Sequence, residues 1–157
     1  MKLIAIDPSL HSTGWAIFGI STMPYQAGLV RPRKEYRDEE LITRCLDIGM
    51  QLVAIAKANY CTQAIIEFPV FYGEGDTNAG SIFKLCGCIG AIAGSLNQAG
   101  VVVSTVLVPE WKGQLPKDVV IRRLKAILGE QFCSDLGLQK DMWDAVGIGL
   151  HYKGVFK

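Results

Sequence analysis

The sequence has no CxxC pair: its five cysteines are odd in number and irregularly spaced, and its two histidines do not have the spacing of a zinc finger. This pattern gives no support for a structural zinc site and favours reduced, mostly buried thiols. Cys86 and Cys88 are two residues apart, so on a helix they would face different directions and could not easily share a metal.

Membrane-spanning and secretory signals are also missing. No apolar run approaches the roughly 20 residues that span a bilayer. The N-terminus lacks the basic-then-apolar order of a signal peptide. We therefore expect an intracellular protein with no membrane partner.

Charge is scarce and balanced, with 20% charged residues and a net charge of +1. Nucleic-acid-binding proteins often carry a clear basic excess, so the net charge does not by itself favour a polyanionic partner. Basic residues gather in RPRKEYR (31–37) and KDVVIRRLK (117–125). A solvated loop or helix face explains each stretch as well as phosphate contact does.

The length and hydrophobic patterning predict one domain over residues 1–157. The patterns predict strands, then helices alternating with strands, then two helices. The ranges are 2–7, 14–20 and 25–31 (strands), 38–58 (helix), 63–68 (strand), 78–99 (helix), 101–108 (strand), 115–128 and 140–153 (helices). Short links favour an antiparallel meander of the first three strands, and helical crossovers favour a parallel part. We therefore expect an α/β fold with a mixed five-stranded sheet flanked by helices.

Acidic residues follow two of the apolar strands. Asp7 comes directly after Leu3–Ile6, and Glu67 ends a second apolar run, with a proline close behind in both cases. Taken alone, Asp7 is explained by turn chemistry. If the two strands are parallel neighbours, both carboxylates emerge at the same edge of the sheet.

The last predicted helix begins with a second pair of acids. Asp141 and Asp144 are three residues apart and share a helix face. The helix dipole alone could explain acids in a first turn, but it does not explain why two strand ends also carry them. Carboxylates held close together raise one another's pKa unless a cation neutralises them. Oxygen ligands suit Mg²⁺ or Mn²⁺, and two such ions about 4 Å apart can hydrolyse a phosphodiester.

Three segments of the sequence carry a resemblance to a known family: IDPSLHSTGWAIF, IIEFPVF and KDMWDAVGIGLHY. They resemble segments of the RuvC-type Holliday-junction resolvases (crossover junction endodeoxyribonucleases) of the ribonuclease H-like superfamily, and they occur in the same order as in that family. The resemblance spans nearly the whole chain and implies a ribonuclease H-like fold. It further implies Mg²⁺-dependent cleavage of four-way DNA junctions by a homodimer, with two ions per site. The metal ligands and catalytic residues that it implies are Asp7, Glu67, Asp141 and Asp144.

The resemblance also nominates residues that contact DNA. Lys112 and Lys117 stand where this family places basic residues near the scissile backbone, and Lys117 is assigned to the catalytic group. Phe71 and Tyr72 stand where the family has aromatic residues that can stack at the junction centre. Arg122, in the second basic stretch, is a further candidate for DNA binding.

The sequence departs from the bacterial pattern at two places. Ser9 stands where glycine is usual, and the loop between Lys112 and Lys117 is shorter than usual. With the modest net charge, these departures suggest a phage, viral or organellar relative. A motor-protein partner is therefore not assumed, and the expected location is the cytoplasm of a bacterium or a phage-infected host cell.

The hypothesis is a nuclease that makes paired cuts in four-way junctions and leaves 5'-phosphate and 3'-hydroxyl ends. Its alternatives are a broader nuclease acting on forks and flaps, and a non-catalytic junction-binding module. The first turn also resembles the phosphate loop of actin-like and sugar-kinase ATP-binding proteins, but that fold needs two such halves. For the helix with Gly87, Gly90 and Gly94, a dimer seam and packing on the chain's own sheet both remain open. His11 and His151 receive no role.

Overall fold

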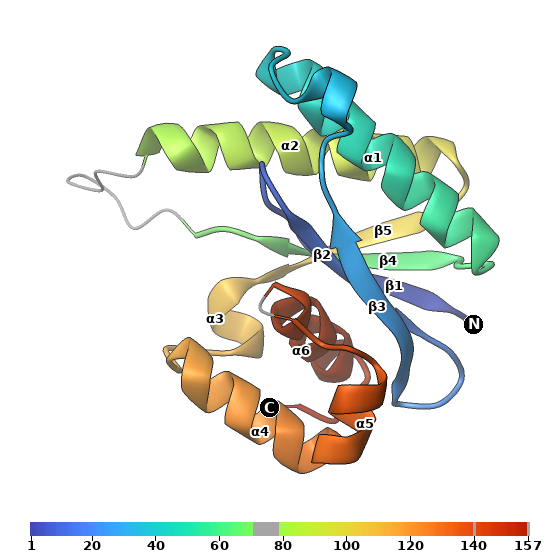
Figure 1. The fold of residues 1–157 in the computed structure, drawn as a ribbon, viewed down its shortest axis with the longest axis vertical. Coiled ribbons are helices and arrows are strands. Elements are labelled where there is room, and N and C mark those ends of the chain that lie inside the picture. Colours follow the sequence, from blue (N-terminus) through green and yellow to red (C-terminus); the bar gives the residue numbers. More distant parts are fainter. Residues whose placement is uncertain (71–78, 140, 157) are drawn as a thin grey trace.

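The chain folds around one mixed sheet of five strands (Figure 1). The computed structural model describes residues 1–70, 79–139 and 141–156. The strands are β1 (Leu3–Asp7), β2 (Thr13–Phe18), β3 (Pro24–Val30), β4 (Gln63–Phe68) and β5 (Val102–Leu107), in the spatial order β3-β2-β1-β4-β5. The first three strands form an antiparallel meander, whereas β1–β4 and β4–β5 are parallel. The predicted mixed α/β sheet is confirmed.

Helices cover both faces of the sheet (Figure 1). The long helices α1 (Leu41–Ala58) and α2 (Ala79–Gln98) lie together on one face. The other face carries α3 (Val108–Trp111), α4 (Lys117–Leu128), α5 (Glu130–Asp135) and α6 (Met142–Tyr152). Both faces of β1 are therefore buried, with Ile4 and Ile6 in the core under α1 and α2 and with Leu3 and Ala5 in the core around α6. Burial on both faces explains why this strand is apolar without alternation.

The predicted helices differ from the observed ones by one to three residues at most of their ends, and two short helices are additional. The helix expected from residue 38 begins at Leu41, because Glu40 is extended (φ −56°, ψ 152°), and a 3₁₀ turn (Lys34–Tyr36) precedes it. Helices α3 and α5 were not predicted. With four and six residues, they are too short to show a helical period.

Helix α2 corrects one expectation. Its 20 residues are long and apolar enough to cross a membrane by length and composition alone, so an apolar segment of that length does occur. Ile89, Ile92 and Leu96 pack into the core against the sheet and α1. The apolar character of α2 therefore has a structural role in this fold.

The glycines of α2 lie on its other side. A Cβ atom built on Gly87, Gly90 or Gly94 would meet no atom within 4 Å. Packing of these glycines on the chain's own sheet, one of the two alternatives from the sequence, is therefore wrong.

Close backbone contact fixes the start of α6 against β2. Gly14 pairs with Asp7 across β1 and β2, and a Cβ atom on Gly14 would collide with the main-chain oxygen of Asp141. Glycine at this position therefore allows α6 to begin beside the carboxyl end of β1.

The substitution Gly14→Ala is expected to lower the free energy of unfolding by about 1–3 kcal/mol, because the added methyl group overpacks this contact. Thermal unfolding measures the effect. Gly19→Ala is the matched control, because a Cβ atom there makes only ordinary contacts with the Tyr25 ring. Equal melting temperatures for the two variants would contradict the importance of the Gly14 contact.

Candidate active site

Three carboxylates meet at the carboxyl edge of the central strands. Asp7 ends β1, Glu67 lies in the neighbouring parallel strand β4, and Asp144 lies in the first turn of α6 with 6% of its surface exposed. Burial raises the pKa of Asp7 well above its ordinary value, and the charges of Glu67 and Asp144 raise it further. The three groups therefore act on one another electrostatically, so acids from two strand ends and one helix start do converge.

Two lysines partly neutralise this acidic cluster. The Lys117 Nζ atom donates a hydrogen bond to Asp144 Oδ2 at 2.6 Å, and the Lys112 Nζ atom lies 3.8 Å from Glu67 Oε2. Burial lowers the pKa of Lys117, but the hydrogen bond to Asp144 and the nearby acids outweigh it, so the net pKa is raised. Lys117 begins α4, where the helix dipole disfavours a cation, and its contact with Asp144 offsets that cost.

Trp111 is a site residue that the sequence analysis missed. Its Nε1–H donates a 2.7 Å hydrogen bond to Glu67 Oε2, and the side chain is 1% exposed. The ring packs on α6, where a Cβ atom on Gly147 would lie 2.5 Å from it. Burial raises the pKa of Glu67, while Lys112 and the Trp111 hydrogen bond oppose that rise. The only signal in the sequence is an indole beside Lys112 in VPEWKG, directly after a strand.

Asp141 and Arg122 are less closely tied to this cluster. Asp141 is the N-cap residue of α6, and its charge contributes to raising the pKa of Lys117. Its carboxylate makes no hydrogen bond or ion pair with any other residue that the structure describes. Arg122 is exposed on α4 and lies 3.8 Å from Asp118.

The remaining candidates fall elsewhere. Phe71 and Tyr72 lie outside the described residues. The His151 Nδ1 atom is 3.1 Å from the main-chain oxygen of Phe156, so this histidine has a structural contact at the end of α6. His11 is exposed in the turn between β1 and β2.

The donor set fits a divalent cation. Asp7, Glu67 and Asp144 supply hard oxygen atoms. Their negative charges repel one another, and a bound cation would neutralise this repulsion. Within residues 1–70, 79–139 and 141–156, no three acids, cysteines or histidines already have a metal-ligating arrangement. Lys117 instead holds Asp144, so a cation would have to compete with the ammonium group for this carboxylate.

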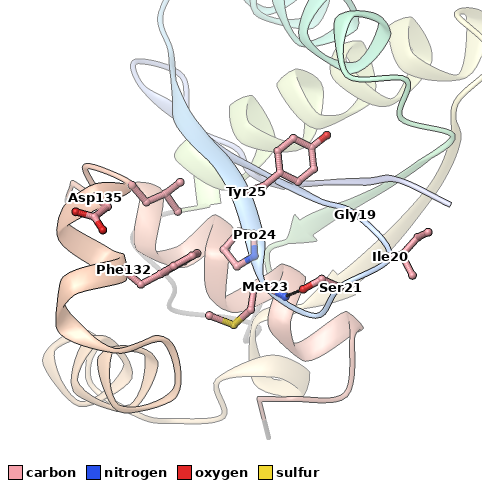
Figure 2. A pocket seen from close by; sticks show the side chains of 9 residues that line it. Gly19, Ile20, Ser21, Met23, Pro24, Tyr25, Phe132 and Asp135 are labelled. Carbon is pink, nitrogen blue, oxygen red and sulfur yellow. Dashed lines mark hydrogen bonds between the residues drawn. The ribbon is translucent and has the colours of Figure 1, made fainter.

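A separate cavity of about 500 Å³ lies at the other end of β2 (Figure 2). The turn between β2 and β3 and helix α5 form its walls, with Met23, Tyr25 and Phe132 among the lining residues. Asp135 is the one carboxylate among the residues that line it. This cavity is therefore distinct from the acidic cluster, which lies at the Gly14 end of β2.

The substitution Trp111→Phe is expected to move the acid limb of the pH–activity profile to higher pH. Removing the Nε1–H donor takes away a contact that lowers the pKa of Glu67, so this carboxylate stays protonated to higher pH. Loss of a hydrogen bond to a charged acceptor should lower activity about tenfold at neutral pH. Initial rates of the reaction proposed for this site, measured between pH 5 and 9, test both effects.

The control for this prediction is Trp15→Phe. The Trp15 Nε1 atom is buried without a hydrogen-bond partner among the described residues, and this ring lies in the core under α1 and α2. Trp15→Phe should leave the acid limb in place. If both variants shift the limb equally, the Trp111–Glu67 hydrogen bond does not tune the site.

Comparison with known proteins identifies the fold. No protein-family model and no curated protein matches the sequence. Among solved structures, RuvC of Thermus thermophilus in complex with a Holliday junction substrate is 19% identical, with 100% of this chain and 98% of that chain covered and a TM-score of 0.74.

One viral and one yeast mitochondrial structure are also similar to this chain. The fowlpox virus Holliday junction resolvase is 12% identical, with 98% of each chain covered and a TM-score of 0.53. The yeast mitochondrial Holliday junction resolvase Ydc2 is 10% identical, with 96% of this chain and 78% of that chain covered and a TM-score of 0.63. The chain therefore has the fold of RuvC-type resolvases, as the three sequence segments predicted. Its place on a phage or viral branch stays a prediction.

Proposed function

We propose that this protein is a metal-dependent endonuclease that resolves four-way DNA junctions by paired phosphodiester hydrolysis, leaving 5'-phosphate and 3'-hydroxyl ends. The observation that carries the proposal is the meeting of Asp7, Glu67 and Asp144 at one sheet edge, with two lysines beside them. The fold shared with three Holliday junction resolvases supports the choice of substrate.

Asp7, Glu67, Asp141 and Asp144 are the proposed ligands of Mg²⁺, with two ions per site and Mn²⁺ as a substitute. When bound, the ions supply Lewis acidity that activates water and stabilises charge on the leaving oxygen. Trp111 holds Glu67 in position, and Lys117 holds Asp144 until a cation competes for it.

Lys112 and Lys117 are also the proposed contacts to the scissile strand. Both ammonium groups lie at the acidic cluster, where they can approach a backbone phosphate. Arg122 is proposed to contact DNA further along α4, and Phe71 and Tyr72 are proposed to stack at the junction centre.

We propose a homodimer in which α2 is the interface, since two symmetric cuts require two active sites. Only 22% of the most apolar part of α2 is buried within the chain, and Phe83 is 74% exposed on it. The open glycine positions would let a second helix approach closely.

The substitution Phe83→Glu tests the interface by light scattering after gel filtration. A shift from dimer to monomer supports the proposal. Ile20→Glu is the control, because Ile20 is 92% exposed in the turn between β2 and β3 and should not affect the dimer. A dimer that persists in Phe83→Glu, or a wild-type monomer, would exclude α2 as the interface.

The function is tested by comparing cleavage of a four-way junction, a fork, a flap and linear duplex DNA with Mg²⁺. Fastest cleavage of the junction supports the proposal, whereas equal rates on forks and flaps indicate the broader nuclease. Equal cleavage of simple duplex would contradict both.

A further inference from the structure

A basic pocket lies on the β3 side of the same sheet edge. It has a volume of about 330 Å³ and is lined by His11, Arg31, Pro32, Arg37 and Arg44. These residues come from the turn after β1, the end of β3, the segment before α1 and the first turns of α1. No carboxylate is among the lining residues, and Arg31, Arg37 and Arg44 give the pocket its positive charge.

The local acids do not neutralise these arginines. The nearby acids pair with Arg33, which lies beside the pocket. Its Nε atom is 2.6 Å from an oxygen of the buried Asp47, and its Nη1 atom is 3.9 Å from an oxygen of Glu35. Arg31, Arg37 and Arg44 form no ion pair with any residue that the structure describes. Three guanidinium groups that share one concave surface without a protein counter-charge create a positive potential there, and this potential attracts an anion.

Arg44 gives a second and independent indication. Its Nε atom is buried and has no hydrogen-bond partner among the described residues. Buried polar atoms are nearly always paired, so an unpaired donor in a pocket wall points to a missing acceptor. Arg44 also stands near the start of α1, whose first turn has no acidic residue and whose N-cap residue, Glu40, makes no side-chain cap. The helix dipole therefore adds to the positive potential.

The frame of the pocket is held by hydrogen bonds. The Gln51 side-chain amide donates to the main-chain oxygen of Arg31 at 2.9 Å, which fixes the strand end. In the turn that carries His11, the Thr13 hydroxyl donates to the main-chain oxygen of Ser9 at 2.9 Å. The His11 main-chain N–H donates to the Ser9 hydroxyl at 3.3 Å. An ordered frame lowers the entropy lost when a ligand binds.

The pocket lies within reach of the catalytic edge. Asp7 pairs with Gly14, and Gly14 pairs with Leu29. Two strand spacings put Leu29 about 10 Å from Asp7, and Arg31 follows two residues later. The two further residues put the Cα atom of Arg31 about 12 Å from that of Asp7. With a rise of about 3.4 Å per nucleotide, this distance corresponds to roughly three to four nucleotides.

We propose that the pocket of His11, Arg31, Arg37 and Arg44 binds a backbone phosphate of the DNA arm that leaves the catalytic carboxylates. Guanidinium groups bind phosphate oxygens in a bidentate manner, and such contacts position DNA without reading its sequence. The inference rests on the proposed function. It adds that one DNA arm of the junction runs from the carboxylates to this pocket. It also gives a role to the RPRKEYR stretch and to His11.

The test measures junction binding by fluorescence anisotropy in EDTA, across a salt series. Each of Arg31→Gln and Arg37→Gln should lower the slope of log Kd against log salt by about one. Both arginines are exposed, so the variants should fold. Lys57→Gln is the matched control, because it removes one exposed positive charge from the far end of α1 and should leave the slope unchanged.

Cleavage rates at saturating junction keep this inference separate from the proposed function. If the arginine variants have reduced salt slopes but the wild type never cuts the junction, the phosphate pocket is supported and the proposed nuclease function is contradicted. If both arginine variants cut the junction normally and have unchanged salt slopes, phosphate binding in the pocket is contradicted.

A second experiment distinguishes a DNA phosphate from free phosphate as the ligand of the pocket. Inorganic phosphate is added to the wild type and to Arg31→Gln/Arg37→Gln, and the melting temperature is measured. Stabilisation of the wild type alone, together with unchanged DNA slopes, would mean that the pocket takes free phosphate and would overturn the proposal. Absence of any DNA binding by the wild type would also overturn it.

Discussion

Replacing Asp7 by asparagine is expected to reduce junction cleavage by at least about 10³-fold, since metal-ion catalysis contributes several kcal/mol to such reactions. The side chain sits among Glu67, Asp144 and the two lysines, so a neutral amide removes a central ligand while keeping the shape. Single-turnover cleavage of a labelled junction measures the loss.

The same substitution is expected to raise the melting temperature in EDTA. Burial and the neighbouring acids raise the pKa of Asp7 above its ordinary value of 3.8, so the folded state holds this proton more tightly than the unfolded state does. The Asp7 contribution to stability is therefore lost as the pH rises from that ordinary value through the raised pKa, and Asp7→Asn removes this loss. Added Mg²⁺ should stabilise the wild type and leave the variant unchanged.

The control for both effects is Asp135→Asn, which removes an exposed carboxylate of α5. It should change neither the cleavage rate nor the response to Mg²⁺. An Asp7→Asn variant that melts below the wild type in EDTA at neutral pH would contradict the electrostatic description of the site.

Replacing Lys117 by methionine is expected to lower cleavage by about 10²-fold, the usual effect of removing one preorganised donor from a charged transition state. Its Nζ atom lies 2.6 Å from Asp144, so the ammonium group is held at the site. In Lys117→Met, Asp144 is free to bind a cation, so half-maximal stabilisation should require less Mg²⁺ than in the wild type. Thermal melting over a Mg²⁺ series measures this change.

Lys117→Arg is the conservative control, since it keeps the positive charge beside Asp144. It should retain the Mg²⁺ requirement of the wild type more closely than Lys117→Met does. Wild-type cleavage by Lys117→Met would exclude a catalytic role for this residue, and a higher Mg²⁺ requirement would exclude competition for Asp144.

The sequence predicted the parts of the site that follow local rules. Asp7 and Glu67 were found because each lies at the carboxyl end of an apolar strand, as the last residue of β1 and the last but one of β4, and parallel neighbours bring strand ends to one edge. Asp144 was found from its spacing to Asp141 at a helix start. These features depend on a few consecutive residues, which is why they can be read without a structure.

The remaining features depend on contacts between distant segments. The Trp111–Glu67 hydrogen bond needs the unpredicted helix α3 and the space above Gly147. The basic pocket needs the turn after β1 and the start of α1 to meet at the end of β3. The pairing of Lys117 with Asp144 joins residues 27 positions apart. None of these contacts leaves a periodic pattern in the sequence.

The most direct measurement is cleavage of an end-labelled four-way junction with Mg²⁺ by the wild type and by Glu67→Gln, with Glu130→Gln as an exposed-carboxylate control. We expect paired cuts near the branch from the wild type and the control, and no cuts in EDTA or from Glu67→Gln. A wild type that binds the junction but never cuts it with Mg²⁺ or Mn²⁺ would contradict the proposed nuclease, and the protein would then be a junction-binding module.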